Sequence, residues 1–332
     1  MTTKILIIQT AFIGDVILAT SLIETVKEHF PHSRIDFLLR KGNESLLANS
    51  PQINKVHIWD KKRKLGSLIE NIKNIRQEKY DYVINIQRFF NSGLMTALSG
   101  GKKTIGFDKN PLSFLFHHKV THLIPDQQEG KPLHEVERNQ KLLKAILPDL
   151  KISPQRPKLY FSEVEENKIK TLHLPQDYLV MAPASVWYTK QFHKDKWQEL
   201  IAQVSQMYKV YLIGAPSDNE LVSSLMQENC ENLCGKLSLL ESAMLMKNAK
   251  RVFVNDSAPL HLASAVNAPT TAIYCSTIPE FGYFPLAEQS IIIQRDPRLE
   301  CMPCGLHGKA ACPLGHFKCS FDIEIDRLIA TI

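Results

Sequence analysis

The 332-residue sequence contains no run of about 18 apolar residues, so a transmembrane helix is not expected. It has no internal repeats and no low-complexity tracts, and its first residues lead into a strand pattern instead of a signal peptide. Basic residues interleaved with aromatics, the usual mark of nucleic-acid binding, are also absent, which argues against DNA or RNA as a partner. These absences predict a cytoplasmic protein without a nucleic-acid partner.

Length and composition describe a soluble globular protein of two domains. At 332 residues the chain exceeds one average domain and suits two of roughly 150 residues each. Hydrophobic residues make up 44% of the sequence and charged residues 22%, with a net charge of +6. Basic clusters occur at 61–64, 102–103 and 117–119. Such clusters suit an anionic surface or substrate, and they also occur in solvated loops.

Strand and helix patterns alternate along the chain in two series. The first series has strand patterns at 4–9, 35–39, 56–59, 82–86 and 104–107, and the second has them at 178–181, 210–214, 252–255, 271–274 and 291–293. Helical stretches such as 65–77 separate them. This alternation predicts an α/β protein with two Rossmann-like halves, each a doubly wound parallel sheet. Pro148, Pro154 and Pro157 punctuate the segment between the halves and predict an interdomain linker.

The segment 251–277 predicts a strand, a tight turn, a short helix and a second strand. Asn255, Asp256 and Ser257 supply side chains that cap a helix beginning near Pro259. A helix N-terminus at the carboxyl edge of a parallel sheet attracts anions, because unpaired N–H groups and the helix dipole favour negative charge there. His261 can add a side-chain donor in the first turn. The same residues are equally typical of an ordinary βαβ crossover with a capped helix.

The motif Asn255–His261 resembles the donor-phosphate turn of the ADP-heptose:lipopolysaccharide heptosyltransferases, glycosyltransferase family 9. That family has the GT-B fold, in which two Rossmann-like domains face each other. The resemblance implies that Asp256, Ser257, Ala258 and His261 bind the donor. The family commonly has glycine where this chain has Ala258, although alanine is the smallest alternative.

Asp15 is the candidate catalytic base. It follows the first strand and lies at the start of a helix, at the edge where α/β proteins bind ligands. The alternative is that Asp15 only caps its helix. The segment Phe12–Ile17 resembles the family's G-D-(V/M)-hydrophobic motif, whose aspartate is the expected base. Gly14 then permits close approach of the acceptor sugar.

A second motif of the family follows the strand at 178–181. Lys190 lies on a loop ahead of a helix that contains Trp197, and a lysine on such a loop can reach diphosphate oxygens. The alternative is an exposed loop lysine. The resemblance favours Lys190 as a donor-binding residue, with Thr189 and Ser185 as hydrogen-bond donors beside it.

Two further segments of the second half match the family's nucleotide site. Glu220 resembles the acid that accepts hydrogen bonds from ribose, with Asp218 as the alternative, and helix-dipole complementation explains either residue equally well. The segment 234–239 matches the one that borders adenine, where Leu237 supplies the apolar contact. An apolar wall by itself is a weak signal.

Four of the seven cysteines, Cys301, Cys304, Cys312 and Cys319, lie near the end of the chain. A C-x2-C pair closed by two more cysteines is compatible with structural zinc, and free thiols are the alternative. The spacing C-x2-C-x7-C-x6-C is not a standard finger spacing. The resembled family often has such a segment without a catalytic metal, so we expect no required cofactor.

Together the motifs predict a first, acceptor-binding domain at 1–155 and a second, donor-binding domain at 156–320. A terminal helix, 321–332, is expected to cross back over the first domain. The resemblance implies an inverting transferase that moves L-glycero-D-manno-heptose from ADP-heptose onto the lipopolysaccharide inner core.

The terminal cysteines favour the second heptosyltransferase, acting on heptosyl-Kdo2-lipid A, over the first, which acts on Kdo. Such an enzyme meets its acceptor at the inner leaflet and is cytoplasmic or peripheral on the inner membrane. The alternatives are another sugar-nucleotide enzyme of this fold, such as a hexosaminyltransferase or a 2-epimerase, and a non-catalytic nucleotide-binding module.

Overall fold

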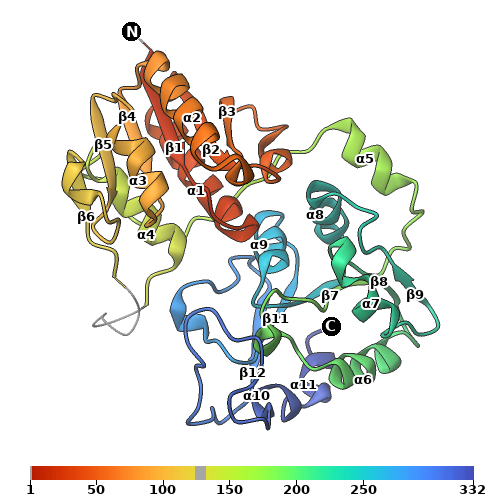
Figure 1. The fold of residues 1–332 in the computed structure, drawn as a ribbon. Helices are drawn as coiled ribbons and strands as arrows, with labels where there is room; N and C mark the ends of the chain where they lie inside the picture. Colours follow the sequence, from red (N-terminus) through yellow and green to blue (C-terminus); the bar gives the residue numbers. More distant parts are fainter. Residues whose placement is uncertain (1, 124–131) are drawn as a thin grey trace. The chain divides into compact units, whose positions relative to one another are not determined.

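The computed structural model describes residues 2–123 and 132–332 (Figure 1). The chain divides into two compact units, Met1–Tyr160 and Phe161–Ile332. The described part of each unit contains one six-stranded parallel sheet. The predicted α/β fold with two Rossmann-like halves is therefore confirmed. No helix among the described residues has the length and apolar character needed to span a bilayer.

The sheet of the first unit has the strand order β3-β2-β1-β4-β5-β6. Its strands are β1 (Lys4–Ile8), β2 (Arg34–Arg40), β3 (Ile53–Trp59), β4 (Tyr82–Asn85), β5 (Lys103–Phe107) and β6 (His118–Val120). Its helices are α1 (Ile13–His29), α2 (Lys64–Glu78), α3 (Phe90–Ala97) and α4 (Glu135–Leu143). Helix α1 packs with α4, and α2 packs with α3. The short edge strand β6 had no counterpart among the predicted strands.

The apolar strands of the first unit are buried because helices cover the sheet. Residues Ile5–Ile8 of β1 are fully buried, and ten residues of α1 are buried as well. One apolar cluster packs α2 and α3 against the sheet and contains Leu6, Ile8, Leu38, Trp59, Leu68, Ile75, Tyr80, Val83 and Met95. Removal of these side chains from water is the main stabilising contribution to the unit.

The proline-punctuated segment belongs to the first unit. The main-chain N–H of Lys158 donates to Thr20 Oγ1 over 2.9 Å, and the Tyr160 hydroxyl donates to Glu24 Oε1 over 2.9 Å. Both partners lie on α1, and Leu159 is buried. The boundary between the units therefore follows Tyr160, and not residue 155 as predicted, because these last residues are bonded to α1.

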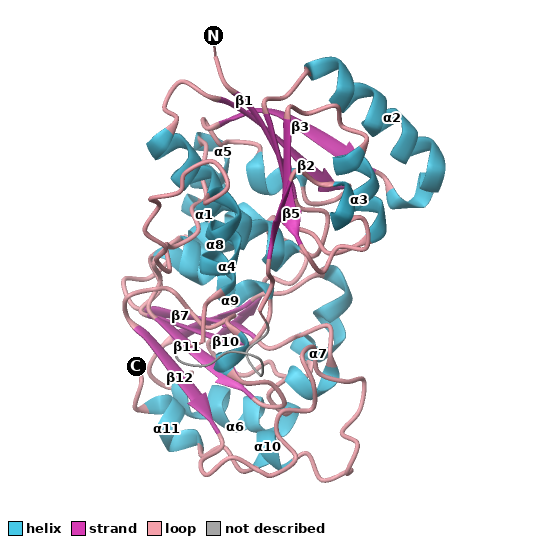
Figure 2. Ribbon diagram, turned by 90° about the vertical axis from the view of Figure 1, so that its left-hand side faces the viewer, coloured by secondary structure: helices cyan, strands magenta, loops and turns pink. Residues whose placement is uncertain are grey.

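The sheet of the second unit has the order β12-β11-β10-β7-β8-β9. Its strands are β7 (Tyr178–Ala182), β8 (Lys209–Leu212), β9 (Cys230–Asn232), β10 (Arg251–Asn255), β11 (Thr270–Tyr274) and β12 (Ser290–Gln294). Its helices are α5 (Glu163–Lys170), α6 (Lys194–Val204), α7 (Asn219–Ser223), α8 (Leu239–Lys247), α9 (Ala258–Ala265), α10 (Lys318–Phe321) and α11 (Ile325–Ile329). Figure 2 shows α8 and α9 on one face of this sheet and α6, α10 and α11 on the other.

The end of the chain packs within the second unit. Residues 321–332 were expected to form one helix over the first domain, but the structure has the two short helices α10 and α11, and α11 packs on α6. Ile325 and Leu328 are buried in the same apolar cluster as Trp197 of α6. Burial of these side chains holds residues 325–328 against the second unit, and the crossing over the first domain stays a prediction.

The two sheets share one topology. Read from β9, the second sheet has the order that the first has when read from β3, so β7 corresponds to β1 and β10 to β4. In both sheets the direction of strand addition reverses between these two strands. Ligands of open parallel sheets bind outside the carboxyl ends of the strands at such a reversal. The loops after β1, β4, β7 and β10 are therefore where each unit can bind a ligand.

Candidate functional site

Asp15 lies at the strand-order reversal of the first unit. It follows β1 and is the third residue of α1, and Phe12 N–H donates to its Oδ2 over 3.2 Å. The helix-capping role proposed as the alternative is therefore real. It does not exclude a chemical role, because Asp15 remains partly exposed, as does Gly14 beside it. The carboxylate is thus fixed by its own helix and accessible at the sheet edge.

The environment of Asp15 makes it a stronger base than an ordinary aspartate. Removal of water around the carboxyl group raises its pKa to about 6, and the negative charge of Glu135 acts in the same direction. The Phe12 N–H and the positive charge of Arg88 oppose this shift without cancelling it. An acid with a pKa near 6 is ionised at pH 7 and still accepts a proton readily, as a general base must.

A second group of charged residues, which the sequence did not indicate, surrounds this carboxylate. Glu135 begins α4 and accepts a hydrogen bond from Arg138 Nε over 2.7 Å, and both side chains are nearly buried. His122 Nε2 lies 3.9 Å from Oε2 of Glu135, the oxygen that accepts from Arg138. Burial lowers the pKa of His122 to about 4, so the ring is neutral at pH 7. Arg88, after β4, contributes positive charge from the opposite strand of the reversal.

Buried amides join the loops at this edge. Gln87 Nε2 donates to Gln9 Oε1, and Asn110 Nδ2 donates to the Gln87 carbonyl oxygen over 3.1 Å. Asn43 Nδ2 donates to the Ala11 carbonyl over 3.2 Å. These bonds connect the loops after β1, β2, β4 and β5, so the Asp15 loop is held from several sides. Pairing of buried polar groups makes such an edge rigid.

In the second unit, Lys190 forms an ion pair with Asp256. Lys190 Nζ lies 2.7 Å from Asp256 Oδ2, and their side chains are 16% and 9% exposed. Lys190 ends the short 3-10 turn Tyr188–Lys190 after β7, and Asp256 follows β10. Thr277 Oγ1, after β11, donates to the same Oδ2 over 2.7 Å. Lys190 and Asp256, both predicted to bind the donor, therefore lie together at one edge of the sheet. The contacts show in addition that Asp256 orients Lys190.

The N-terminus of α9 adds buried hydrogen-bonding groups beside this pair. Ser257 precedes the helix, Ala258 is its first residue, and Ser257 Oγ and His261 Nδ1 are buried without a hydrogen-bond partner among the described residues. Burial lowers the pKa of His261 to about 4, so its ring is a neutral donor and acceptor at pH 7. Unpaired buried polar atoms at a helix N-terminus are the groups an anionic ligand would satisfy.

Asn255, the last residue of β10, fixes the loop that carries Lys190. It is fully buried, its Oδ1 accepts from Phe192 N–H over 2.9 Å, and its Nδ2 donates to the Pro183 carbonyl over 2.7 Å. The carbonyl of Ser185, a predicted donor-binding residue, accepts from Gln191 Nε2 over 2.7 Å. The loop between β7 and α6 is thus anchored at both ends.

Thr189 is nearly fully buried inside the same turn. Its Oγ1 accepts hydrogen bonds from Ser276 Oγ over 2.9 Å and from Lys309 N–H over 2.8 Å. Sequence reasoning proposed Thr189 as a donor-binding residue beside Lys190. The structure shows that its hydroxyl organises the turn.

The turn after β8 separates the two candidate ribose acids. Asp218 Oδ2 accepts from Ala215 N–H over 2.8 Å and closes the turn. Glu220, in α7, is exposed, and its carboxylate makes no ion pair or side-chain hydrogen bond with a described residue. Of the two acids, Glu220 is the one with free acceptor oxygens. This geometry favours Glu220 over Asp218 as the acid that accepts ribose hydroxyls.

Leu237 belongs to a loop whose Gly235 contacts that turn. Gly235 has φ +69°, its N–H donates to the Gly214 carbonyl over 3.0 Å, and an added Cβ would come within 3.0 Å of Pro216. The loop that holds Leu237 therefore packs against the turn ahead of Glu220. Leu237 is partly exposed, as an apolar contact for a ring requires.

The terminal cysteines do not form a zinc site in the structure. All seven cysteines are free thiols. Residues 301–319 lie wholly within the described chain, where no three His, Cys, Asp or Glu side chains are grouped so that they can hold a metal ion. Cys319 packs in the apolar core, where burial and the charges of the thiols Cys304, Cys312 and Cys301 raise its pKa to about 12. The described residues thus show no assembled metal site, and structural zinc at these four cysteines stays a prediction.

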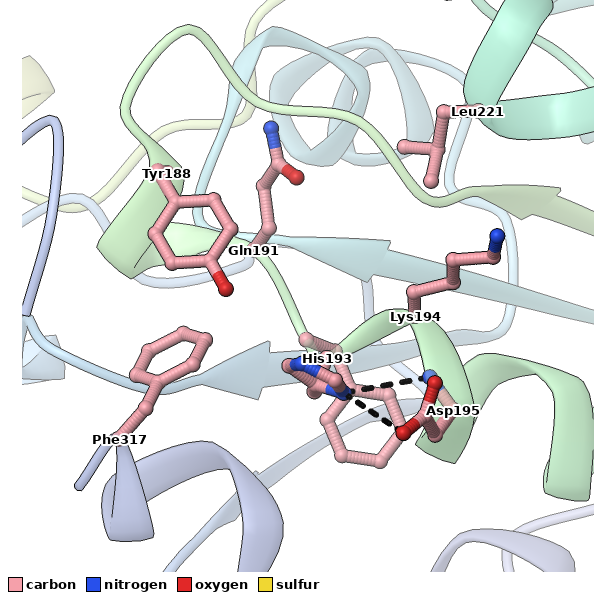
Figure 3. A pocket seen from close by; sticks show the side chains of 8 residues that line it. Tyr188, Gln191, His193, Lys194, Asp195, Leu221 and Phe317 are labelled. Carbon is pink, nitrogen blue, oxygen red and sulfur yellow. Dashed lines mark hydrogen bonds and ion pairs between the residues drawn. The ribbon is translucent and has the colours of Figure 1, made fainter. Parts of the chain in front are cut away.

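A pocket of about 290 Å³ is lined by Tyr188, the first residue of the turn that Lys190 ends (Figure 3). Tyr188, Gln191, His193, Lys194 and Phe317 are among its lining residues. None of the predicted site residues lines it. Lys194, the next lysine after Lys190, lines this pocket, and among the described residues it makes no ion pair with Asp256, the partner of Lys190.

Comparison with known proteins agrees with this geometry. The sequence profile of glycosyltransferase family 9 (heptosyltransferase) matches residues 69–313. The chain belongs to glycosyltransferase family 9. Family membership makes the chain a glycosyltransferase, confirms the resemblance read from the motifs, and disfavours both the epimerase and the non-catalytic module.

Individual members of the family are similar over most of the chain. Lipopolysaccharide heptosyltransferase 3 of Escherichia coli is 27% identical over 281 residues, covering 80% of this chain and 82% of that protein. Lipopolysaccharide heptosyltransferase 2 of E. coli K12 is 27% identical over 318 residues, covering 88% of each chain. The solved structure of E. coli ADP-heptose lipopolysaccharide heptosyltransferase II has a TM-score of 0.81 at 23% identity, covering 99% of this chain and 97% of that one. This last likeness shows a common fold.

Proposed function

We propose that this family 9 member transfers L-glycero-D-manno-heptose from ADP-heptose to the lipopolysaccharide inner core with inversion at the anomeric carbon. The observation that carries the proposal is the Lys190–Asp256 pair beside Ser257 Oγ and His261 Nδ1, which have no hydrogen-bond partner among the described residues, at the N-terminus of α9. A cation and N–H donors at one sheet edge suit a nucleoside diphosphate. The similar proteins named as lipopolysaccharide heptosyltransferases supply the sugar and the acceptor class.

The second unit is the proposed donor-binding domain. Lys190 and the α9 N–H groups bind the diphosphate, and His261 donates from its neutral ring. Asp256 cannot donate a hydrogen bond when ionised, so its role is to hold Lys190. Glu220 accepts from the ribose hydroxyls and Leu237 contacts adenine. Negative charge on the diphosphate grows as the glycosidic bond breaks, and a preorganised cation stabilises that charge.

The first unit is the proposed acceptor-binding domain, with Asp15 as the general base. The acceptor hydroxyl oxygen forms a bond to the anomeric carbon, and its proton moves to Asp15. The bond from that carbon to the diphosphate breaks, and ADP leaves with the electron pair. A base with a pKa of about 6 is suited to this proton transfer at neutral pH. Gly14 leaves room beside the carboxylate for the sugar.

We infer further that the acceptor is heptosyl-Kdo2-lipid A, so that the product carries the second heptose. The similar proteins include one named heptosyltransferase 2 and one named heptosyltransferase 3, so acceptor length is the property to test. The experiment incubates the protein with ADP-heptose and each of three lipid acceptors, ending in Kdo, in one heptose and in two heptoses. Mass spectrometry should show one added heptose only on the second acceptor. Addition to the Kdo-terminated lipid would assign the first transfer instead.

Lys190 and the helix N–H groups supply the positive charge that the departing diphosphate needs, so we propose that transfer requires no metal cofactor. Elemental analysis of the purified protein and an assay after chelation test this proposal. We expect unchanged transfer in chelator. Loss of transfer that added metal restores, in protein that stays folded, would contradict it.

The lipid acceptor implies peripheral association with the inner face of the membrane, and helix α2 offers a suitable surface. Leu65 and Ile69 are 71% and 64% exposed, and their spacing places them on one face of the helix. The exposed Lys61 and Lys62 precede this helix. Apolar side chains beside cations suit an anionic bilayer. Ile69→Glu should reduce co-flotation with anionic vesicles and leave transfer to a detergent-dispersed acceptor intact. Equal flotation of the wild-type protein and the Ile69→Glu variant would place the membrane contact elsewhere.

A further inference from the structure

Residues 301–319, which carry four cysteines, contact the 3-10 turn Tyr188–Lys190 through their main chain. Thr189 N–H donates to the Lys309 carbonyl over 3.1 Å, and Lys309 N–H donates to Thr189 Oγ1 over 2.8 Å. The two residues therefore exchange hydrogen bonds although 120 positions separate them. Because Thr189 is buried, both bonds are shielded from water. Lys190 is the residue that follows.

A second attachment connects the same segment to the end of β11. Cys304 N–H donates to the Ser276 carbonyl over 2.9 Å, and Ser276 Oγ donates to Thr189 Oγ1 over 2.9 Å. Thr277, the next residue, donates to Asp256, the partner of Lys190. The segment 304–309 is thus bonded to the turn that carries Lys190 and to the loop that holds its counter-ion.

Gly308 fits the space above the Lys190 side chain. Its φ of +75° lies in the region that side chains rarely adopt. A Cβ added at this position would come within 2.8 Å of Lys190 Cγ and within 3.2 Å of Thr189 Oγ1 and Trp187 Cβ. The main chain of Gly308 therefore lies against the aliphatic part of Lys190, on the side chain that extends to Asp256.

We propose that the main chain at Gly308–Lys309 is a positioning element of the donor site. It packs on the Lys190 stem and bonds Thr189, so the ammonium group is held at the diphosphate position before the donor arrives. This inference rests on the proposed donor role of the second unit. Residues 304–309 thereby help to position the lysine that binds the diphosphate, and this role does not depend on a metal. Preorganised charge is effective because no reorganisation accompanies the reaction.

The first test compares Gly308→Ala with Gly315→Ala. Gly315 has a similar φ of +70°, but an added Cβ there meets no atom within 4 Å, so this variant carries the backbone strain without the contact. We expect Gly308→Ala to lower the single-turnover transfer rate by about 10²-fold, as a small misplacement of a positioning group does. Gly315→Ala should transfer at the wild-type rate. Equal rates for both variants, or equal losses, would overturn the inference.

A double-mutant cycle separates positioning from general damage. If Gly308 acts through Lys190, adding Gly308→Ala to Lys190→Ala should cause little further loss of ADP affinity or transfer rate. Multiplied losses would mean that Gly308 acts elsewhere. Should Lys190→Ala alone leave both quantities unchanged, the proposed donor site itself fails, which is a different result.

A second pair of variants keeps the test valid if Gly308→Ala does not fold. Thr189→Val removes the hydroxyl that accepts from Lys309 N–H, whereas Thr189→Ser keeps it. Thermal unfolding verifies that both are folded. We expect the valine variant to show weaker ADP binding and slower transfer, and the serine variant to recover most of both. Failure of serine to recover more than valine does would contradict the proposed attachment.

Discussion

The two units share a strand order, yet the edges at their reversal points carry opposite chemistry. At the first, after β1 and β4, the central group is a carboxylate whose pKa is raised to about 6. At the second, after β7 and β10, it is a lysine held by a buried aspartate. One scaffold therefore carries a carboxylate with a raised pKa in one copy and a paired ammonium group in the other, and we propose that they accept a proton and bind an anion. The loops, and not the sheet, determine what each unit does.

Burial and neighbouring charges account for the difference between the Asp15 and Lys190 edges. In the first unit, Glu135 adds negative charge near Asp15, which strengthens it as a base. In the second, Asp256 and Thr277 fix the lysine, while the unpaired Ser257 hydroxyl lies beside them. A carboxylate near another carboxylate resists ionisation, whereas a lysine near a carboxylate remains charged. If this contrast is functional, variants at the two edges should affect different measurements.

The largest effect is expected at Asp15. Asp15→Asn keeps the shape of the side chain but removes its ability to accept a proton, so transfer should fall by roughly 10²–10⁴-fold. ADP affinity should stay near the wild-type value, because the donor groups lie in the other unit. Single-turnover assays and calorimetric ADP titration measure both. A correctly folded mutant with normal turnover would remove Asp15 from the mechanism.

Lys190→Ala should weaken ADP binding, which Asp15→Asn does not. It should also lower the transfer rate by about 10²-fold, the range for loss of one group that stabilises developing charge. Lys190→Arg should recover only part, since a planar guanidinium does not reproduce a compact ammonium. Lys194→Ala is the matched control, because that lysine lines the separate pocket. If the control lost as much ADP affinity as Lys190→Ala, net charge and not position would explain the effect.

The pH dependence of transfer sharpens the comparison. Asp15 must be ionised to accept a proton, and its pKa is about 6, so the rate should fall as the pH drops below 6, by about tenfold at pH 5. Glu135→Gln removes a charge that raises this pKa, so the acid limb should move to lower pH. Glu24 lies on α1 with Asp15, and its carboxylate accepts a hydrogen bond from Tyr160, so Glu24→Gln should leave the acid limb in place. An unshifted limb in Glu135→Gln would separate Glu135 from the base.

His261→Ala should have the smallest effect, about a two- to tenfold loss of ADP affinity, corresponding to one hydrogen bond. Because the pKa of His261 is lowered to about 4, the ring stays neutral between pH 5 and 8, and the loss should be constant over that range. Titration of ADP at several pH values measures this. A loss that appears only at low pH would show that the ring acts as a cation.

The sequence predicted the fold well because apolar strands and capped helices are local patterns. Asp15, Lys190 and Asp256 were predicted as site residues because each follows a buried strand and matches a motif of the family, and their roles stay predictions. Glu135 and Gly308 were missed, because their roles come from residues more than 100 positions away, Asp15 for Glu135 and Lys190 for Gly308. No local pattern reports such contacts.

Other contacts were missed for a similar reason. The burial of Ile325 and Leu328 against α6 was not visible from the amphipathic pattern of residues 321–332. Structural zinc at the terminal cysteines stays a prediction for elemental analysis. The roles of Ser185, Thr189, Leu237 and the other predicted donor residues remain predictions for binding measurements.

The ion pair of Lys190 with Asp256 also bears on how the donor site responds to ionic strength. Because the charge of Asp256 lies 2.7 Å from the Lys190 ammonium, the pair produces little field at long range, although the ammonium can still donate hydrogen bonds to a ligand in contact with it. ADP-heptose is selected by contacts made at short range, and its affinity should change less with added salt than that of a site built from unpaired lysines.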